Sequence, residues 1–336
     1  MKAWQLTRLG IEGLELLEVD RAPLGPREIR LRMLACALNY RDLLMIRGEY
    51  DPRLQLPLIP LSDGVGEVVE VGAEVTRVAV GDRVAGCFAP RWVAGRPRRD
   101  LIRATRGGPL PGMLATEHVC DAEGVVRVPP FLDDTQAATL PCAALTAWSA
   151  LVTHGRIRAG QTVLLQGTGG VSLFALQFAV MHGARAVVTS SSDAKLARAR
   201  TLGAAVTINY TQDRHWGKTA AAHTEEGVDL VVEVGGAGTL DQSLRAVRPG
   251  GVIAMIGVLG GVAPTVALTK ILMNEVRVQG ILVGPREGFE EMNQAIATRR
   301  LTPVVDRVFG FDEAPAALRY LESGAHFGKV VIRVAD

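Results

Sequence analysis

The 336-residue sequence is poor in cysteine and in aromatic residues, and neither sign of charge is in clear excess. Its four cysteines are too few and too scattered to predict a disulfide framework in a chain of this length. The balance of 37 basic against 35 acidic residues does not by itself predict a nucleic-acid or membrane partner. A hydrophobic fraction of 48% excludes a disordered chain, a coiled coil and a collagen-like fibre.

The sequence also shows no signal peptide and no clear membrane span. The first twenty residues carry acidic side chains and no apolar core, so we expect a cytoplasmic protein with reduced cysteines. Residues 251–273 are mostly apolar, but Pro264, Lys270 and four glycines interrupt the run. A membrane span needs about 20 apolar residues in one helix. We therefore predict buried parallel strands joined by turns, since strands covered on both faces are continuously apolar.

The organisation of the chain changes near Pro129 and Pro130. Before this point, short alternating runs bounded by glycine and proline predict a mostly β region with irregular loops. After it, strands alternate with helices, which predicts βαβ units and a parallel sheet. A length of 336 residues fits about two domains. The expected strands cover residues 162–166, 186–189, 228–234, 252–258 and 329–334, and the expected helices cover 172–182, 193–202, 239–247, 289–298 and 313–323.

A glycine-rich turn lies between the expected strand 162–166 and the following helix. In dinucleotide-binding folds the first glycine of such a turn allows a tight bend, and the second lets a pyrophosphate approach the backbone. Free amides and the positive end of the helix then hold the phosphates. Ser172 stands where a third glycine is usual. A glycine-rich turn without a ligand is the alternative to the dinucleotide site that we predict at Gly167, Thr168, Gly169, Gly170 and Val171.

The second expected strand bears on the choice between NAD(H) and NADP(H). An NAD site usually places an acidic residue about 20 residues beyond the turn, where it accepts hydrogen bonds from the ribose. Hydroxyls with a cation instead suit a 2′-phosphate, so NADP(H) is favoured over NAD(H). Asp193 as the ribose acid, and Ser192 or Asp193 as a helix cap, are open alternatives. The residues expected around the 2′-phosphate are Ser190, Ser191, Lys195 and Tyr210.

Several motifs follow one another along the chain: Asn39-Tyr40-Arg41-Asp42, Pro57-Leu58-Ile59-Pro60, Asp63-Gly64-Val65-Gly66-Glu67-Val68, Leu140-Pro141-Cys142-Ala143-Ala144 and Phe327-Gly328-Lys329-Val330-Val331. In this order they resemble the motifs of the medium-chain dehydrogenase/reductase superfamily. This resemblance implies an α/β fold, with a GroES-like, mostly-β catalytic domain and a Rossmann domain built on a doubly wound parallel sheet. It implies residues 1–136 and 285–336 for the first domain, residues 137–284 for the second, an active site between them, and a homodimer or homotetramer.

The superfamily contains zinc and zinc-free enzymes, and the residues at the ligand positions distinguish them. A catalytic zinc needs three protein ligands and one open position. In the zinc enzymes of the family these ligands are a Cys, the His of a Gly-His-Glu stretch, and a Cys or Asp. Here the first position falls at Asn39 or Tyr40, the His-Glu pair reads Ser62-Asp63, and only Cys142 remains. The region of the structural zinc holds only Cys87, so we expect no zinc.

Without zinc, the sequence most resembles the quinone oxidoreductase branch of the family. Hydride transfer there needs a positioned nicotinamide and a group that stabilises or protonates the developing enolate or alkoxide. The candidates for that group are Asn39, Tyr40, Tyr50 and Asp63, whereas Asp42 is expected to be structural. The resemblance also implies a cofactor-lining role for Thr146, Gly235, Gly257, Val258, Phe327, Gly328 and Lys329.

Three functions remain open at this point. The first is a zinc-independent, NADP(H)-dependent oxidoreductase that transfers hydride to a quinone, enone or related carbonyl compound. The second is metal-free alcohol oxidation, or the reduction of ketones or aldehydes. The third is a nucleotide-binding protein with little turnover, similar to zeta-crystallin, which only the basic segment 91–111 favours. We expect a small-molecule substrate and no membrane or nucleic-acid partner.

Overall fold

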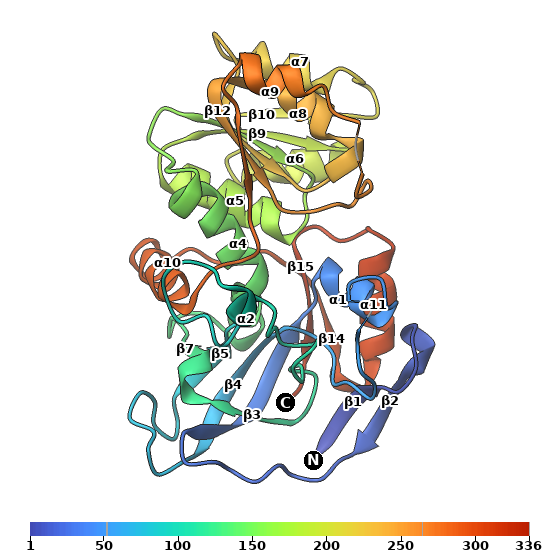
Figure 1. Ribbon diagram of the computed structural model, residues 1–336, viewed down its shortest axis with the longest axis vertical. Coiled ribbons are helices and arrows are strands. Elements are labelled where there is room, and N and C mark those ends of the chain that lie inside the picture. Colours follow the sequence, from blue (N-terminus) through green and yellow to red (C-terminus); the bar gives the residue numbers. More distant parts are fainter. Residues whose placement is uncertain (52, 264, 336) are drawn as a thin grey trace. The chain divides into compact units, whose positions relative to one another are not determined.

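The computed structural model describes residues 1–51, 53–263 and 265–335. Pro264, one of the expected interruptions of the apolar run, lies outside the described residues. The chain forms two compact units (Figure 1). One consists of Met1–Leu145 and Gly284–Asp336, and the other of Thr146–Val283. The sequence predicted divisions after residues 136 and 284, and the units divide after Leu145 and Val283.

The first unit is built on a mixed sheet with the strand order β14-β15-β3-β4-β5-β7, and β6 pairs with β3. Strands from opposite ends of the chain meet in it, because β15 pairs antiparallel with β3. The larger elements are β3 (Glu28–Ala37), β4 (Asp63–Val71), β5 (Arg83–Gly86), β6 (Glu117–Asp121), β7 (Val125–Arg127), β14 (Val305–Gly310), β15 (Lys329–Arg333), α1 (Tyr40–Ile46), α10 (Arg286–Arg299) and α11 (Ala314–Glu322). Strands β1 (Lys2–Leu6) and β2 (Leu14–Glu18) form a separate pair, and α2 (Arg99–Ile102) and α3 (Asp134–Ala137) are short.

The alternation of apolar residues along β3 explains how this sheet forms its core. Ile29, Leu31 and Met33 point to one face and are fully buried. They belong to a cluster that also contains Leu43 of α1 and Leu318 of α11. Alternate residues of a strand share one face of the sheet, so this pattern gives one apolar side that the helices cover. The prediction of a mostly β region is confirmed.

The second unit contains a six-stranded sheet with the order β10-β9-β8-β11-β12-β13, and every pairing in it is parallel. The prediction of βαβ units with a parallel sheet is therefore confirmed. The strands are β8 (Thr162–Gln166), β9 (Arg185–Ser190), β10 (Val206–Asn209), β11 (Val228–Glu233), β12 (Val247–Met255) and β13 (Arg277–Gly280). The helices are α4 (Leu145–Trp148, which begins at the division), α5 (Gly170–Met181), α6 (Asp193–Thr201), α7 (Trp216–Ala221), α8 (Leu240–Ala246) and α9 (Leu268–Met273).

The strand order reverses direction beside β8. From β8 the chain adds β9 and then β10 on one side, whereas β11, β12 and β13 follow on the other side. The loops that leave the carboxyl ends of β8 and β11 consequently run to opposite faces. Such a switch point leaves a crevice at the carboxyl ends of the strands, which is where open parallel sheets bind ligands.

The apolar run 251–273 is only partly the buried strand that the sequence predicted. Strand β12 covers its beginning and starts earlier than expected, at Val247. Beyond Met255 the prediction is wrong, because α9 occupies the end of the run and its Leu268, Leu272 and Met273 are each more than 70% exposed. Ile271 of the same helix packs against the core. The run thus contains a strand followed by a helix with one covered face. A continuous apolar sequence does not by itself distinguish buried strands from such a helix.

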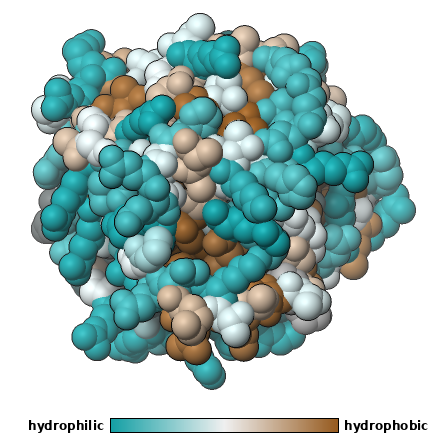
Figure 2. All heavy atoms as spheres, turned by 90° about the horizontal axis from the view of Figure 1, so that it is seen from above, coloured by the Kyte–Doolittle hydropathy of each residue, from teal (hydrophilic) through white to brown (hydrophobic). Residues whose placement is uncertain are grey.

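Among the described residues, no helix has the length and apolar character needed to cross a membrane. Figure 2 shows one face of the molecule, on which apolar side chains occur as separate small areas among hydrophilic ones. Isolated apolar areas of this kind are normal for the surface of a globular protein.

The basic segment 91–111 is more than a solvated surface loop. It contains α2, and its Arg106 is 3% exposed. The Arg106 guanidinium donates to the carbonyl of Cys87 and lies 2.6 Å from Nε2 of His118. Burial, and then the Arg106 charge, lower the pKa of His118 to about 3, so this ring stays neutral and accepts from Arg106. Part of the segment's positive charge therefore holds the fold together.

The β3 core generates a stability prediction. Leu31→Ala should destabilise the first unit by about 2–5 kcal/mol, because it removes fully buried apolar volume and leaves a cavity. Val69→Ala on the adjacent strand β4 is the matched control, since Val69 is 39% exposed and should cost less than about 1 kcal/mol. Thermal unfolding of both variants checks this, and equal shifts in the midpoint would contradict the assignment of the core face.

Candidate nucleotide-binding turn and polar cluster

The glycine-rich turn joins β8 to α5 at the switch point of the second unit. Gly167 has φ +75°, a left-handed conformation that favours glycine, and its amide donates to the carbonyl of Thr189 at 2.8 Å. A Cβ atom at Gly167 or at Gly169 would have no other atom within 4 Å. These two glycines are therefore not needed for packing within the unit, and the space beside them is open to a ligand.

Helix α5 begins in this open space. Gly169 precedes its first residue, and no side chain caps the helix there. A twelve-residue helix with uncapped amides carries partial positive charge at its start and suits an anion. Ser172, at the position of the third glycine, is buried and donates its hydroxyl to the carbonyl of Gln166 at 2.6 Å. The serine thus fits the close contact of helix and strand because its hydroxyl finds a backbone acceptor.

A buried acid that the sequence analysis did not single out shapes the loop beside this turn. Glu233 ends β11, is fully buried, and accepts from the Gln166 amide at 2.7 Å and from the amides of Gly235 and Gly236 at 2.8 and 3.0 Å. The hydroxyls of Thr239 and Ser243 also donate to it. An acid at the end of an apolar strand is the only signal for this network in the sequence. The network fixes Gly235, one of the expected cofactor-lining residues.

The carboxyl end of β9 holds the residues expected to choose between the two nucleotides. Ser190 is buried, whereas Ser191 is exposed and Tyr210 is 42% exposed. The Ser192 hydroxyl accepts from the amide of Lys195 at 3.4 Å and caps α6, as one alternative foresaw. The Asp193 carboxylate accepts from the side-chain amides of Asn209 and Gln212 at 2.8 and 3.0 Å.

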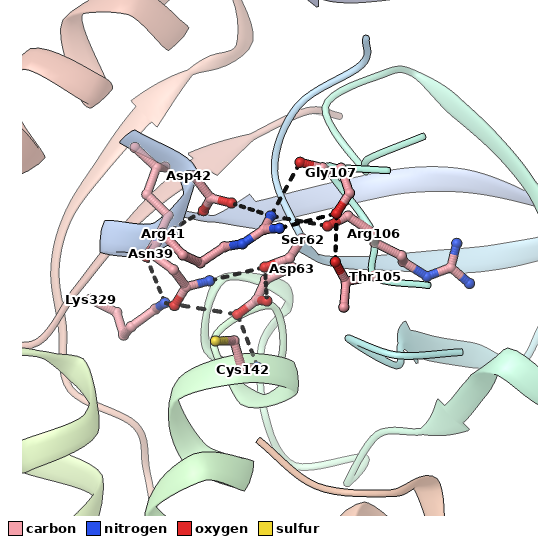
Figure 3. Close-up of polar contacts among 12 residues, drawn as sticks. Asn39, Arg41, Asp42, Ser62, Asp63, Thr105, Arg106, Gly107, Cys142 and Lys329 are labelled. Atoms are coloured by element: carbon pink, nitrogen blue, oxygen red, sulfur yellow. Dashed lines mark hydrogen bonds and ion pairs between the residues drawn. The ribbon is translucent and has the colours of Figure 1, made fainter. Parts of the chain in front are cut away.

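In the first unit, a polar cluster connects three of the expected site residues (Figure 3). The Lys329 ammonium, at the start of β15, donates to Oδ1 of Asn39 at 2.6 Å and to the carbonyl of Leu38 at 2.6 Å. It also lies 3.8 Å from Oδ2 of Asp63, the first residue of β4. Lys329 is 3% exposed and Asp63 is fully buried, so the cluster contains an ion pair away from water.

The hydrogen bonds of the cluster form a chain of donors that leads from Lys329 through Asn39 and Ser62 to the Asp63 carboxylate. Because Oδ1 of Asn39 accepts from Lys329, its Nδ2 faces Ser62 and lies 3.3 Å from the hydroxyl. That hydroxyl donates to Oδ1 of Asp63 at 2.7 Å, and the amide of Cys142 donates to Oδ2 at 3.2 Å. The orientation of the Asn39 amide is thus set by the lysine on one side and the serine on the other. Ser62 is a member of the cluster that sequence reasoning did not select.

Burial controls the ionisation of the carboxylates here. Removal from water raises the pKa of Asp63 to about 6, although the Lys329 charge acts in the opposite direction. Burial likewise raises the pKa of Asp42, against the lowering effect of Arg41. Asp42 accepts the amide of Asn39 at 2.8 Å and caps the start of α1. This geometry agrees with the structural role predicted for Asp42.

The two candidate tyrosines lie outside the hydrogen-bonded cluster. Tyr50 stacks on the buried guanidinium of Arg41, whose central carbon is 5.0 Å from the ring centre. Arg41 also contacts the ring of Phe88, pairs with Asp42 and donates to the carbonyls of residues 106–108. Tyr50 is 42% exposed. Tyr40 begins α1 and is also exposed.

The remaining expected site residues are distributed over both units. Thr146 is buried in α4, and Gly257 and Val258 follow β12 in the second unit. Phe327 is buried, and Gly328 has φ +92° just before β15 in the first unit. Lys329 was expected at the cofactor, whereas its ammonium contacts the candidate catalytic residues Asn39 and Asp63.

The residues at the expected zinc positions do not fit a tetrahedral zinc site. Asn39 and Ser62 are neutral oxygen and nitrogen groups, and the Asp63 carboxylate already accepts from Ser62 and Cys142. Burial, and then the Asp63 charge, raise the pKa of the Cys142 thiol, which disfavours the thiolate that metals bind. Among residues 1–51, 53–263 and 265–335, no group of three or more His, Cys, Asp or Glu side chains is arranged to hold a metal.

Two family models match the chain. The alcohol dehydrogenase GroES-like domain matches residues 25–130, and the zinc-binding dehydrogenase model matches residues 170–298. A zinc-type alcohol dehydrogenase-like protein of Schizosaccharomyces pombe is 41% identical over 318 residues, which cover 93% of this chain and 92% of the relative.

Solved structures extend this similarity to the whole fold. A Sinorhizobium meliloti 1021 protein that carries an alcohol dehydrogenase name superposes with a TM-score of 0.93 at 42% identity, covering 99% of this chain and 98% of that one. The quinone oxidoreductase from Coxiella burnetii gives a TM-score of 0.81 at 26% identity over 100% and 99% of the two chains. With its GroES-like unit, its parallel-sheet unit and these relatives, the chain belongs to the medium-chain dehydrogenase/reductase superfamily of oxidoreductases.

Proposed function

We propose that this oxidoreductase is zinc-independent, uses NADP(H), and transfers hydride to a quinone, an enone or a related carbonyl compound. The observation that carries the proposal is the open turn at Gly167 and Gly169, which leads into the uncapped start of α5 at the switch point of the sheet. Backbone amides at such a place bind a pyrophosphate without any side-chain charge. The bound nucleotide would supply the hydride.

The preference for NADP(H) rests on the end of β9. A 2′-phosphate there would meet the exposed Ser191, the Tyr210 hydroxyl and the positive charge of Lys195. The acid nearest in sequence, Asp193, already accepts two amide hydrogen bonds, from Asn209 and Gln212. This engagement makes Asp193 a poorer acceptor for the ribose hydroxyls of NAD(H).

On the substrate side, Asn39 is the best-supported donor. Its Nδ2 lies 3.3 Å from the Ser62 hydroxyl and also hydrogen-bonds the Asp63 carboxylate, so the oxygen of a substrate would share these N–H donors. A fixed amide donor stabilises negative charge that develops on that oxygen during hydride transfer. The hydroxyl of the partly exposed Tyr50, whose ring stacks on the Arg41 guanidinium, is the second candidate donor. Tyr40 remains a candidate on its exposure alone.

Asp63 and Lys329 act through Asn39 in this proposal, since both are almost fully buried. Lys329 holds the amide oxygen, and Asp63 holds the serine hydroxyl that faces the amide nitrogen. Both are therefore positioning residues, and Asp63 is no longer a candidate for direct contact with substrate.

The donor set at the expected zinc positions, which does not suit zinc, narrows the substrate class. A simple alkoxide concentrates its charge on one oxygen and benefits most from a Lewis acid. An enolate or a reduced quinone spreads the charge over a conjugated system, which one or two neutral donors can stabilise. Conjugated acceptors therefore fit this donor set better than simple alcohols.

Assembly into a homodimer or homotetramer stays a prediction.

A substrate screen tests the proposal. With NADPH, turnover should be faster with quinones and enones than with simple ketones, and dialysis against a chelator should leave the rate unchanged, because no step uses zinc. NADP⁺ reduction by alcohols is measured in parallel. Alcohol oxidation as the main activity, or tight NADPH binding without any turnover, would each contradict the proposal.

The charge of Lys195 should distinguish the two nucleotides. Lys195→Gln should weaken NADPH binding about tenfold, because one charge-assisted contact to a phosphate is worth roughly 1–2 kcal/mol. NADH binding should change less than about twofold, since NADH has no 2′-phosphate. Fluorescence titration measures both affinities. Lys218→Gln, at an exposed lysine of α7, is the matched control. Equal losses for both nucleotides, or tighter binding of NADH by the unaltered protein, would refute the NADP(H) assignment.

Ionisation of Asp63 should appear in the pH dependence. Its pKa of about 6 means that the carboxylate is protonated below this pH, which removes the acceptor of Ser62 and the counter-charge of Lys329. We expect kcat/KM to fall as the pH drops through about 6. Asp63→Asn should lower activity several-fold and remove this inflection, whereas Ser62→Ala should retain it. Profiles between about pH 5 and pH 8 check the prediction, and an unchanged inflection in D63N would show that another group titrates.

A further inference from the structure

A polar cavity of about 280 Å³ lies in the second unit, at the edge of the sheet where its strands begin. Gln161 precedes β8, Asp229 lies at the start of β11, and Arg248 lies at the start of β12; all three line the cavity. The glycine-rich turn follows the opposite end of β8. Five strand residues separate the two places by roughly 16 Å. The cavity is therefore a different site from the nucleotide-binding turn.

The lining of this cavity carries an excess of positive charge. Four arginines contribute to it, against one carboxylate, that of Asp229. Oδ1 of Asp229 accepts from Nε of Arg248 at 2.8 Å, and its Oδ2 accepts from the amide of Thr162 at 2.8 Å. The carboxylate thus compensates Arg248 and a strand amide, and the other three arginines remain: Arg156, Arg158 and Arg277.

One of these three has a structural role. Arg277 donates to the carbonyl of His154, at the end of the π-helical segment Ser149–His154, and so completes the end of that helix. No such role accounts for Arg156 and Arg158. In the part of the chain that the structure describes, neither guanidinium has a carboxylate partner. Two positive side chains are thus left at the cavity without a counter-charge from the protein.

The backbone of Arg156 is strained, which is a second, independent observation at this cavity. Arg156 has φ +52°, in the left-handed region that a residue with a side chain adopts at a cost in free energy. It follows the end of a helix, where glycine or asparagine is usual. The sequence therefore places a long cationic side chain where the fold alone favours glycine, and that side chain lines the cavity.

We propose that this cavity binds a phosphoryl group, either inorganic phosphate or a phosphomonoester. Guanidinium groups present paired N–H donors that match the oxygens of a phosphate, and several arginines together stabilise its double charge. A volume of about 280 Å³ accommodates a phosphate with a small organic substituent. Arg156 and Arg158 would supply the free donors, while Asp229 keeps Arg248 in place.

Equilibrium dialysis with labelled inorganic phosphate tests the proposal on the full chain. Saturating NADP⁺ is present, so that phosphate does not occupy the nucleotide-binding turn, and chloride keeps the ionic strength constant. We expect one phosphate per chain, and about tenfold weaker binding in Arg156→Gln and in Arg158→Gln. The control is the double variant Arg91→Gln/Arg96→Gln, which removes two exposed arginines of the first unit and should bind phosphate normally.

Competition with glycerol 3-phosphate separates the two sources of the phosphoryl group. Displacement of labelled phosphate at lower concentration than unlabelled phosphate requires would identify a phosphomonoester, and the reverse order would identify the free anion. No binding, or binding that Arg158→Gln leaves unchanged, would overturn the proposal. Arg158→Gln also serves if Arg156→Gln unfolds. NADPH binding by these variants is measured separately, and its absence in all proteins would count against the proposed function alone.

Discussion

The buried ammonium of Lys329 is the contact on which the polar cluster depends. A charge removed from water must be compensated, and here the carbonyl of Leu38, the amide oxygen of Asn39 and the Asp63 carboxylate compensate it together. These partners come from the end of β3, the start of α1 and the start of β4, and the lysine itself comes from the last strand of the chain. Without Lys329, Asp63 would be a buried anion with no cation beside it, and the side-chain amide of Asn39 could rotate by 180° and exchange its oxygen and nitrogen. Lys329 thus lowers the pKa of Asp63 against the larger effect of burial, and its hydrogen bond to Asn39 sets the direction of the amide donor.

Glu233 shows a second way of burying a carboxylate. Among the described residues no cation pairs with it, and it accepts from side-chain and backbone donors of Gln166, Gly235, Gly236, Thr239 and Ser243. Two of these donors are amides of the loop after β11, so the acid gives that loop a fixed shape beside the glycine turn. The two units therefore compensate a buried carboxylate in different ways. The neutral donors around Glu233 form a rigid hydrogen-bond network. The Asp63–Lys329 ion pair instead responds to pH, because the pKa of Asp63 is about 6.

Features of the fold that depend on neighbours in sequence could be predicted from the sequence. Strand β8 was expected at its observed bounds, and the turn at Gly167 follows it because left-handed glycines and the start of α5 are local properties. Features that depend on distant partners could not be predicted. Arg106 is buried because His118 and the carbonyl of Cys87 accept hydrogen bonds from it. Neither acceptor lies in segment 91–111, so the sequence of this segment does not predict the burial. Ser62 and Glu233 were missed for the same reason. The exposed face of α9 depends on what lies beside it, which hydrophobicity along the chain does not record.

The pairing of β15 with β3 has a consequence for how the protein is made. The sheet of the first unit lacks β14 and β15 until the ribosome has passed the second unit, whereas all six strands of the second unit precede Val283. During translation the second unit can fold as soon as it leaves the ribosome, while residues 35–37 of the earlier-made β3, beyond the part that pairs with β6, still lack their partner strand along one edge. Closing that edge joins residues almost 300 positions apart, a slow long-range step that comes last. Strand β15 therefore completes the sheet of the first unit, and the polar cluster with it, only after the whole second unit has been synthesised.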